Sequence, residues 1–388
     1  YYTNNESLIS DVEFDKLLVE LKELEEKYPE YKEKNSPTEI VGATSLKETK
    51  FQKVAHKKPM LSLSNSYNEG DISDFIERVK KLLPEEKNLA YALELKLDGL
   101  SLSIQYEEGK LVRAVTRGDG TVGEDVTENI LEIESIPKIL KEKVSIEIRG
   151  EVVLPLSKFE ELNKKRMENG EEVFANPRNA AAGTLRQLDS SIIKERGLDA
   201  YFYFLVDAQN YGVKTHSESI EYLAKLGIKT TGVCEVLKNS SELISRIEYW
   251  GEKRESLDYE TDGMVIKVDN IELWDKLGNT TKSPRWAIAF KFPAKQVTTK
   301  ILGVTWQVGR TGKVTPVAEL EEVELSGSRV KRASLHNYQE IERKDIRIGD
   351  SVFIEKAAEI IPQVVKAVKE LRDGNEIIIK EPTHCPIC

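Results

Sequence analysis

The chain has 388 residues, of which 39% are hydrophobic and 32% are charged. This composition is typical of a globular protein, and at about 150 residues per domain the length predicts two or three domains, so disorder and a single small module are excluded. The longest unbroken apolar run is the seven residues from Ala200 to Val206, and no charged-then-apolar leader opens the chain. Because a bilayer-spanning helix needs about 20 apolar residues, the sequence excludes a membrane protein.

Cysteines are scarce in this sequence. There are three, and two of them, Cys385 and Cys388, lie in the last four residues. No disulfide framework is therefore available, and a reducing compartment is expected. The chain starts at Tyr1 without a Met and stops inside a C-x-x-C pattern, so we expect it to be a piece of a longer protein.

The formal charge of −10 hides a strong segregation of charge along the chain. Residues 276–318 carry eight Lys or Arg and no Asp or Glu. A run of this kind is often a solvated face. A polyanion such as DNA or a phosphate chain, however, repels carboxylates as much as it attracts cations, so this stretch is also a candidate contact for phosphates.

The first expected element is an amphipathic helix of about 18 residues, because apolar residues recur every three or four positions up to Tyr28. Ser10 and Glu13 have capping-box spacing at its start, and a small helical unit is expected to about residue 48. From about residue 50 to 300, short alternating strands are broken by turns that contain Gly. Helices are expected within this part near 71–83, 157–169, 217–227 and 240–255.

A β-hairpin is expected where residues 104–106 and 111–116 flank a Glu-Glu-Gly turn. The sheet should therefore be at least partly antiparallel. After about residue 298 the strands dominate again. Period-two runs at 303–308, 314–320 and 350–355 predict a small closed β module.

The segment from Ala90 to Tyr106 contains the candidate nucleophile. Glu94, Lys96 and Asp98 share one face of a strand, and three leucines share the other. After Gly99 the alternation of apolar and polar residues changes phase, so Gly99 is expected at a bend or bulge where two strands meet. A surface ladder of ion pairs fits this pattern. So does a lysine nucleophile. Its amine must lose a proton before it can attack, so burial or nearby cations must lower its pKa, or a base must accept the proton. Asp98 or Glu94 is close enough in sequence to orient or deprotonate Lys96.

Read as a motif, residues 96–99 are K-x-D-G, which is typical of covalent nucleotidyltransferases. Five further motifs accompany it: R-G-D-G-T-V-G-E-D at 117–125, R-G-E at 149–151, N-P-R-N-A-A-A-G at 176–183, D-G-M-V-I-K at 262–267 and A-F-K-F-P at 289–293. This set closely resembles the NAD-dependent DNA ligases of bacteria. The resemblance runs over essentially all 388 residues.

Both ends of the chain resemble the same family. The first residues look like the small helical domain that holds the nicotinamide mononucleotide half of NAD, although Tyr2 and Phe14 stand where His and Tyr are expected. Residues 307–312 and 333–337 resemble the family's OB-fold. Residues 382–388 resemble the opening half of its four-cysteine zinc finger.

The resemblance implies an α+β fold. We expect a nucleotidyltransferase domain of ATP-grasp-like type with antiparallel sheets, an N-terminal helical domain and a C-terminal OB-fold β-barrel. The expected domains are 1–48 for nicotinamide mononucleotide, 49–297 for adenylation, 298–380 for the OB-fold and 381–388 for the start of the zinc finger.

The reaction implied by the resemblance is the sealing of nicks in duplex DNA, as used in replication and repair. Lys96, with Asp98 as the second catalytic residue, would attack NAD and carry AMP, which passes to the 5′-phosphate before the 3′-hydroxyl seals the nick. Lys267 and Lys291 have apolar neighbours, so each must snorkel or meet an anion, such as the transferring phosphate. The implied cofactor contacts are Tyr1, Tyr2, Asp11, Val12, Glu13, Phe14, Asp15, Ser62, Leu63, Glu94, Arg117, Glu151, Tyr203, Asp262, Lys267 and Lys291.

The resemblance also implies partners and metals. Arg178, Arg186 and Arg310 are the candidates for DNA backbone contacts. Cys385 and Cys388 are half of a zinc site, which cannot close within this chain and is expected to be empty; zinc belongs to the full-length protein. Mg²⁺ or Mn²⁺ is expected to neutralise phosphate charge. We expect a monomeric enzyme in the bacterial cytoplasm, at the nucleoid, acting on NAD and nicked duplex DNA.

Four other functions fit parts of the sequence. The glycines at 118, 120 and 123 fit the G-x-G-x-x-G pattern of dinucleotide-binding oxidoreductases, but they follow an antiparallel hairpin instead of a buried parallel strand. A non-catalytic DNA-binding module would explain the basic stretch and leave Glu94, Lys96 and Asp98 unexplained. An ATP-using ligase or a capping guanylyltransferase shares the K-x-D-G motif.

Overall fold

The computed structural model describes residues 51–388 except 172, 175, 188, 293–295, 310, 311, 313, 326, 327 and 358–360, together with a few scattered positions before residue 51. The helix expected from Ser10 and the small helical unit lie largely outside these residues. The expected cofactor residues Tyr1, Tyr2 and 11–15 lie outside them entirely. The chain divides into two compact units, one of which includes residues 51–292 and the other residues 296–388.

Two β-sheets form the first unit. The four-stranded sheet is antiparallel and has the order β5-β4-β7-β8, with the strands β4 (Leu100–Glu107), β5 (Lys110–Thr116), β7 (Ile146–Val153) and β8 (Asp199–Leu205). The five-stranded sheet has the order β2-β11-β10-β3-β9, with β2 (Ser64–Ser66), β3 (Tyr91–Leu97), β9 (Cys234–Leu237), β10 (Thr261–Val268) and β11 (Ala287–Lys291). A third pair joins β1 (Lys53–Ala55) to β6 (Val122–Glu124). The expected hairpin of β4 and β5 is confirmed, whereas β2 runs parallel to β11 and departs from the antiparallel expectation.

Several helices of the first unit begin at polar caps that their sequences supply. Asn68 accepts a hydrogen bond from the Asp71 amide before α2, and Thr215 forms a capping box with Glu218 before α7. The four expected helices are confirmed as α2 (Glu69–Leu82), α4 (Leu156–Glu168), α7 (His216–Lys225) and α8 (Ser240–Lys253). Shorter helices are α3 (Thr127–Ile130), α5 (Pro177–Leu185), α6 (Ser191–Arg196), α9 (Glu272–Leu277), η2 (Ala208–Tyr211) and η3 (Arg254–Ser256).

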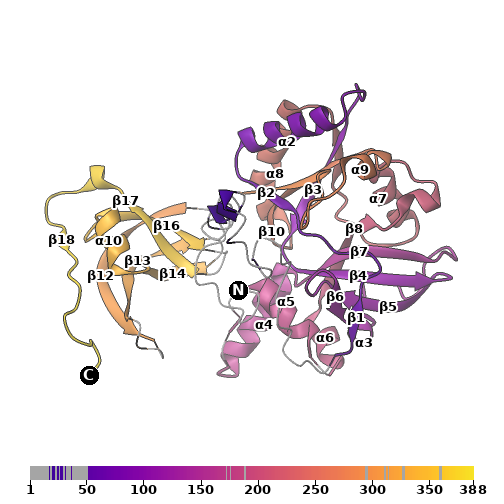
Figure 1. Cartoon of the computed structure of the whole chain (residues 1–388). Helices are drawn as coiled ribbons and strands as arrows, with labels where there is room; N and C mark the ends of the chain where they lie inside the picture. Colours follow the sequence, from indigo (N-terminus) through magenta and orange to yellow (C-terminus); the bar gives the residue numbers. More distant parts are fainter. Residues whose placement is uncertain are drawn as a thin grey trace. The chain divides into compact units, whose positions relative to one another are not determined.

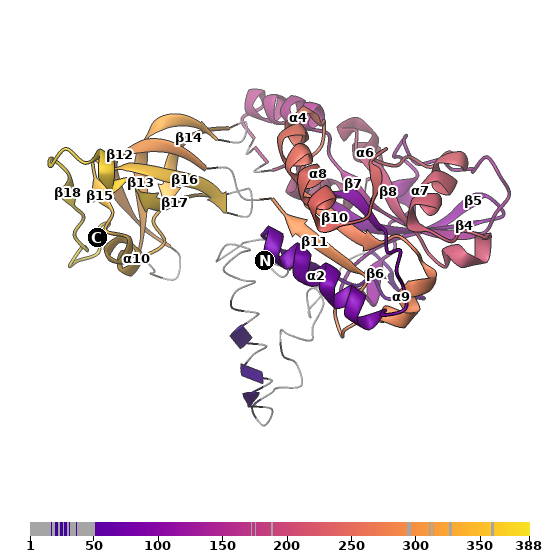
Figure 2. The ribbon, with the colours of Figure 1, turned by 90° about the horizontal axis from the view of Figure 1, so that it is seen from above.

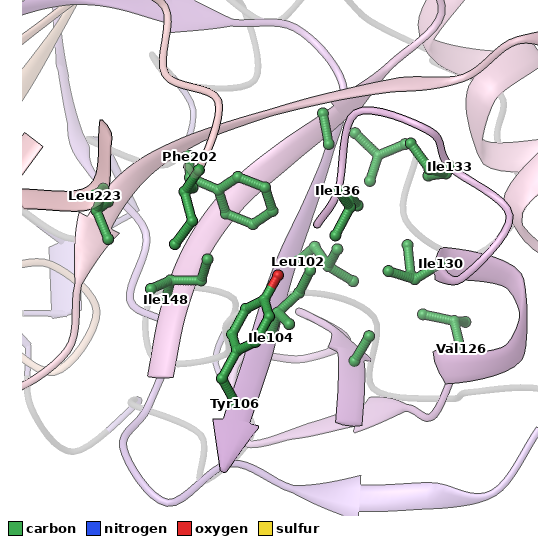
Figure 3. Packing of buried hydrophobic residues seen from close by; sticks show 14 of the residues in the cluster. Leu102, Ile104, Tyr106, Val126, Ile130, Ile133, Ile136, Ile148, Phe202 and Leu223 are labelled. Carbon is green, nitrogen blue, oxygen red and sulfur yellow. The ribbon is translucent and has the colours of Figure 1, made fainter. Parts of the chain in front are cut away.

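Each sheet has an apolar core on one face. Ile104, Tyr106, Ile148 and Phe202 of the four-stranded sheet pack with residues of α3 such as Ile130 (Figure 3). On the five-stranded sheet, residues of β3 and β10 pack against α2 and α8, which lie side by side (Figure 1). Because side chains alternate along a strand, the opposite face of β3 and β10 is left for polar residues.

Gly99 joins the two sheets between β3 and β4, as its phase flip predicted. A Cβ atom at this position would lie 2.2 Å from the carbonyl oxygen of Val152. No side chain fits there, because real non-bonded contacts of this kind exceed 3 Å. The close approach brings the end of β3 against β7.

The second unit is a closed β-barrel with the order β12-β13-β14-β17-β16 (Figure 2). Its strands are β12 (Gln296–Val308), β13 (Val314–Leu325), β14 (Ser328–Ser334), β16 (Ser351–Ala357) and β17 (Ile361–Ala367). The barrel confirms the small closed β module expected after about residue 298. It is accompanied by α10 (Tyr338–Lys344), η4 (Lys369–Leu371) and the short pair β15 (Arg347–Ile348) and β18 (Ile377–Ile378).

Candidate active site

A strip of short side chains lies on the polar face of the five-stranded sheet. Lys96 pairs with Gly263 and Glu94 pairs with Val265 on the neighbouring strand. The same register places short residues beyond them on β11. We call this strip the small-residue floor; its members are Ala92, Gly263, Val265, Ala287 and Ala289.

The floor separates two groups of charged residues. Glu94 and Lys96 are two positions apart on β3, so they point to the same side at a spacing of about 7 Å. Gly263 has no room for a side chain, because a Cβ would lie 1.9 Å from the Phe290 carbonyl oxygen. Lys96 lies in one row with Gly263 and Lys291, and Glu94 lies in the next row with Val265 and Ala289; we call these the Lys96 end and the Glu94 end of the floor.

At one end of the floor, Lys96 is paired with Asp262. Its Nζ donates hydrogen bonds of 2.8 Å to both carboxylate oxygens, and the Nζ of Lys291 lies 3.4 Å from Oδ2. Burial alone would raise the pKa of Asp262, but Lys96, Lys291 and Arg178 outweigh it and lower that pKa. Asp262 is therefore ionised, and its carboxylate holds the Lys96 amine in place.

Asp98 lies just beyond β3, and its carboxylate is paired with Arg178. Its amide donates to the Glu260 carbonyl oxygen, and its side chain pairs with Arg178 near the start of α5. The sequence offered Asp98 or Glu94 as the partner of Lys96; the structure gives Lys96 a different carboxylate. Arg178, expected at DNA, is one-third exposed and close enough to Asp262 to lower its pKa.

Residues of the four-stranded sheet provide a second set of polar groups near Lys96. Glu151 on β7 accepts hydrogen bonds from the Ser101 hydroxyl at 2.9 Å and the Tyr203 hydroxyl at 3.4 Å. Burial raises the pKa of Glu151, and Arg178, the Ser101 hydrogen bond, Lys96 and Arg117 offset this only in part. Lys96, Arg178 and Arg117 are thus close enough to influence Glu151, and no described hydrogen bond or ion pair joins the Arg117 side chain to this set.

At the other end of the floor, Glu94 forms a buried cluster with Lys267 and His216. Its Oε2 lies 2.6 Å from Lys267 Nζ and 3.0 Å from His216 Nε2, and Lys267 also donates to the Tyr203 carbonyl oxygen at 3.2 Å. Burial lowers the pKa of His216, so its ring is neutral at pH 7. Of the two expectations for Lys267, snorkelling or meeting an anion, the second holds, and the anion is Glu94.

The Glu94 carboxyl is kept ionised by this cluster. Burial would raise its pKa, but His216 and Lys267 oppose burial and bring the pKa to about 2. We assign most of the effect to Lys267, because a neutral imidazole contributes no full charge. The cluster therefore presents a carboxylate and an ammonium side by side.

A metal ion is not needed to explain the Glu94 cluster. Ligand atoms of Glu94, His216 and Cys234 lie within 4.8 Å of one another, and these residue types suit zinc. The ammonium of Lys267 already contacts Glu94 and His216, however, and burial raises the pKa of the Cys234 thiol to about 12. A cation is thus already in place, and the thiolate that zinc binds is disfavoured.

Several remaining sequence predictions fall near or outside this site. Ser62 and Leu63 are partly buried in the loop before β2, where the Ser62 amide donates to the Lys282 carbonyl oxygen. Arg186 lies 3.3 Å from the buried Glu124, and Arg310 lies outside the described residues. Cys385 and Cys388 are exposed and supply two ligands where a structural zinc site needs four.

Sequence reasoning did not single out two residues that shape the pocket. Arg149 donates to the carbonyl oxygens of Lys58 and Pro59 and so fixes the loop that leads to Ser62. Its place in the R-G-E motif was the available signal. His216 follows only a capping Thr, and no sequence pattern pointed to its contact with Glu94.

Comparison with known proteins agrees with this geometry. Family models described as the NAD-dependent DNA ligase adenylation domain, the NAD-dependent DNA ligase OB-fold domain and the DNA ligase-like N-terminal NAD⁺-binding domain match residues 48–295, 298–376 and 1–42. Over its full length the chain is 70% identical to a DNA ligase of Fusobacterium nucleatum and 51% identical to one of Thermotoga petrophila. The chain belongs to the NAD-dependent DNA ligase family, which confirms the resemblance seen in the sequence.

The chain spans 56% of the length of both of these relatives. Among the described residues, no helix is long and apolar enough to cross a membrane.

Proposed function

We propose that this chain is the adenylating part of an NAD-dependent DNA ligase, and that the whole protein seals nicks in duplex DNA during replication and repair. The observation that carries the proposal is the position of Lys96, held by Asp262 beside Lys291 at the end of the small-residue floor. A lysine nucleophile and a second cation at one place suit attack on a phosphate.

In the first step, Lys96 gives up a proton and its nitrogen bonds to the α-phosphorus of NAD. The phosphorus–oxygen bond to nicotinamide mononucleotide breaks, and that group leaves with the oxygen. Asp262 is the nearest base for the proton, since both of its oxygens lie 2.8 Å from Lys96 Nζ. Lys291 stabilises the charge that develops on the phosphate. AMP then passes to the 5′-phosphate of a nick, and the 3′-hydroxyl displaces it.

The remaining residues are assigned to parts of the nucleotide according to the end of the floor at which they lie. We assign Glu94 and Lys267 to the base of the nucleotide, with Ser62, Leu63 and Tyr203 around it. We assign Arg117 and Glu151 to the ribose and phosphate, and Asp98 to orienting Arg178. The segments before residue 48 would hold nicotinamide mononucleotide, and Arg178, Arg186 and Arg310 would contact DNA.

The residues of the pocket are compatible with Mg²⁺ or Mn²⁺ as a second cofactor. Magnesium is usually bound by one or two carboxylates together with phosphates and water. Asp262 suits this role once Lys96 is adenylated, because the carboxylate then loses its main partner. When bound, the ion would neutralise phosphate charge; zinc would require ligands beyond Cys385 and Cys388.

The proposal also includes the domain limits, which are 1–48, 49–297, 298–380 and 381–388. It further includes a monomeric state and a location in the bacterial cytoplasm at the nucleoid. The bacterial relatives support the location. The family model that matches residues 1–42 supports NAD over ATP as the donor.

The decisive experiment is mass spectrometry of the chain after incubation with NAD and Mg²⁺. We expect a gain of one adenylate on Lys96, none in Lys96→Ala, and discharge by nicotinamide mononucleotide but not by pyrophosphate. An adduct formed only with ATP would instead support the ATP-using ligase, and no adduct with any nucleotide would overturn both. Self-adenylation should be more robust than nick sealing in this chain.

A further inference from the structure

His216 is a buried titratable residue to which the proposed chemistry gives no task. It is the first residue of α7 and is 1% exposed. Its amide donates to the Asp269 carbonyl oxygen at 2.7 Å, and its ring lies beside Trp274 and Phe204 with centroids 5.9 and 6.4 Å away. Backbone and aromatic contacts therefore fix the orientation of the ring.

The hydrogen-bond partners of the ring assign its two nitrogens. The Ser219 hydroxyl donates to the His216 carbonyl oxygen at 2.6 Å, so its lone pairs are free to accept from Nδ1, which lies 3.5 Å away. This favours the tautomer with the proton on Nδ1. Nε2 is then an acceptor for the ammonium of Lys267 at 3.0 Å, and the same ammonium contacts Glu94 Oε2, which also lies 3.0 Å from Nε2.

Lys267 is consequently held by two hydrogen bonds and one ion pair. Its Nζ donates to His216 Nε2 at 3.0 Å and to the Tyr203 carbonyl oxygen at 3.2 Å, and it lies 2.6 Å from Glu94 Oε2 as an ion pair. The position of the ammonium is thus set before any ligand arrives. An acceptor on a bound base would compete with the longest of these bonds, to Tyr203.

We propose that His216 is a positioning residue that holds Lys267 beside Glu94, so that a donor and an acceptor stand together for the base of the nucleotide. This inference rests on the proposed function. Adenine offers the complementary pair, an acceptor at N1 and a donor at its 6-amino group. Hypoxanthine reverses both groups, with a proton on N1 and a carbonyl oxygen at position 6.

Three features make His216 a better holder than a charged residue. Because burial lowers its pKa, the ring stays neutral, and it accepts a hydrogen bond from Lys267 without adding a second positive charge near Glu94. Asp269, whose backbone and side chain bind the start of α7, fixes the helix that carries it. The site of chemistry at Lys96 lies two residues further along β3 than Glu94, so the two ends can be perturbed separately.

The test compares self-adenylation by wild type and variants with NAD and with nicotinamide hypoxanthine dinucleotide. His216→Phe keeps an aromatic ring beside Trp274 and removes both nitrogens. His216→Gln returns a polar group to the region of Nε2. Leu223→Ala, a fully buried position on the same helix, controls for lost stability without touching the cluster.

We expect wild type to prefer NAD by roughly tenfold or more in kcat/KM. In His216→Phe, KM for NAD should rise by about tenfold, the preference should fall towards one, and kcat should change by less than about threefold. His216→Gln should recover most of both losses. Leu223→Ala should lower kcat through the active fraction and leave KM and the preference unchanged.

The inference is overturned if His216→Phe keeps the wild-type KM and preference, or if kcat falls while KM does not move. Should His216→Phe not fold, Ser219→Ala decides, because it removes the partner of Nδ1: a raised KM supports the inference and an unchanged KM overturns it. Failure of the proposed function gives a different result, namely no adduct in wild type.

Discussion

Lys96 and Asp262 meet because β10 carries an irregularity at the point where it passes β3. Thr261 pairs with Leu97 and Gly263 pairs with Lys96, which leaves Asp262 as the extra residue between them. Such a bulge re-aims a side chain that regular alternation would send to the opposite face. The carboxylate reaches both 2.8 Å contacts with Lys96 Nζ for this reason.

Asp262→Asn should therefore slow self-adenylation. The amide cannot accept the proton of Lys96 and no longer balances Lys96 and Lys291, so we expect a loss of about 10²- to 10⁴-fold in the rate of adduct formation. Single-turnover kinetics with NAD would measure it. Asp275→Asn, an exposed carboxylate on α9, is the control. A variant within threefold of wild type would show that another group takes the proton.

Substitutions in the small-residue floor should lower the free energy of unfolding. Gly263→Ala places a Cβ 1.9 Å from the Phe290 carbonyl oxygen and forces β10 and β11 apart, at a cost of about 1–3 kcal/mol. Gly303→Ala on β12 meets nothing within 4 Å and serves as the control. Urea unfolding of the two variants gives the comparison. Equal stabilities would mean that the strands separate without cost.

Parts of this site follow from the sequence and parts do not. Strand alternation was enough to place Glu94 and Lys96 on one face and to predict the bend at Gly99. Alternation could not find the partner of Lys96, because a bulge breaks the period at Asp262. Nor could it find His216, whose contact with Glu94 depends on how α7 packs against β8 and β9, and this is a tertiary relation between segments far apart in the chain.

The Glu94 cluster should make stability depend on pH in acid. The pKa of Glu94 is lowered from 4.5 to about 2, so the folded chain binds fewer protons than the unfolded chain between these values. The stabilisation is present above about pH 4.5 and is lost as pH falls towards 2. Over this window wild type should lose on the order of 3 kcal/mol more than Glu94→Gln.

Urea unfolding at a series of pH values checks this expectation. Glu107→Gln, which removes an exposed carboxylate on β4, should follow the wild-type curve. Parallel curves for wild type and Glu94→Gln would show that Lys267 does not hold the carboxylate ionised.

Arg186 can be tested in two ways. Its expected role at DNA predicts an effect on DNA binding, whereas its observed contact with Glu124 predicts an effect on stability. Glu124 is 1% exposed, and neither of its carboxylate oxygens makes a hydrogen bond to any described residue; Arg186 Nε lies 3.3 Å from Oε2. Arg186→Ala would leave a buried charge without its partner and should cost roughly 3 kcal/mol, whereas Lys194→Ala, at an exposed position on α6, should cost little.

Adding Glu124→Leu to Arg186→Ala should restore much of the lost stability, since the unpaired charge is then gone. The four unfolding free energies of this double-mutant cycle separate a structural role from a role at DNA. If Arg186→Ala leaves stability intact but weakens binding to nicked duplex DNA in a salt-dependent way, the contact with Glu124 is incidental and the arginine serves the phosphate backbone.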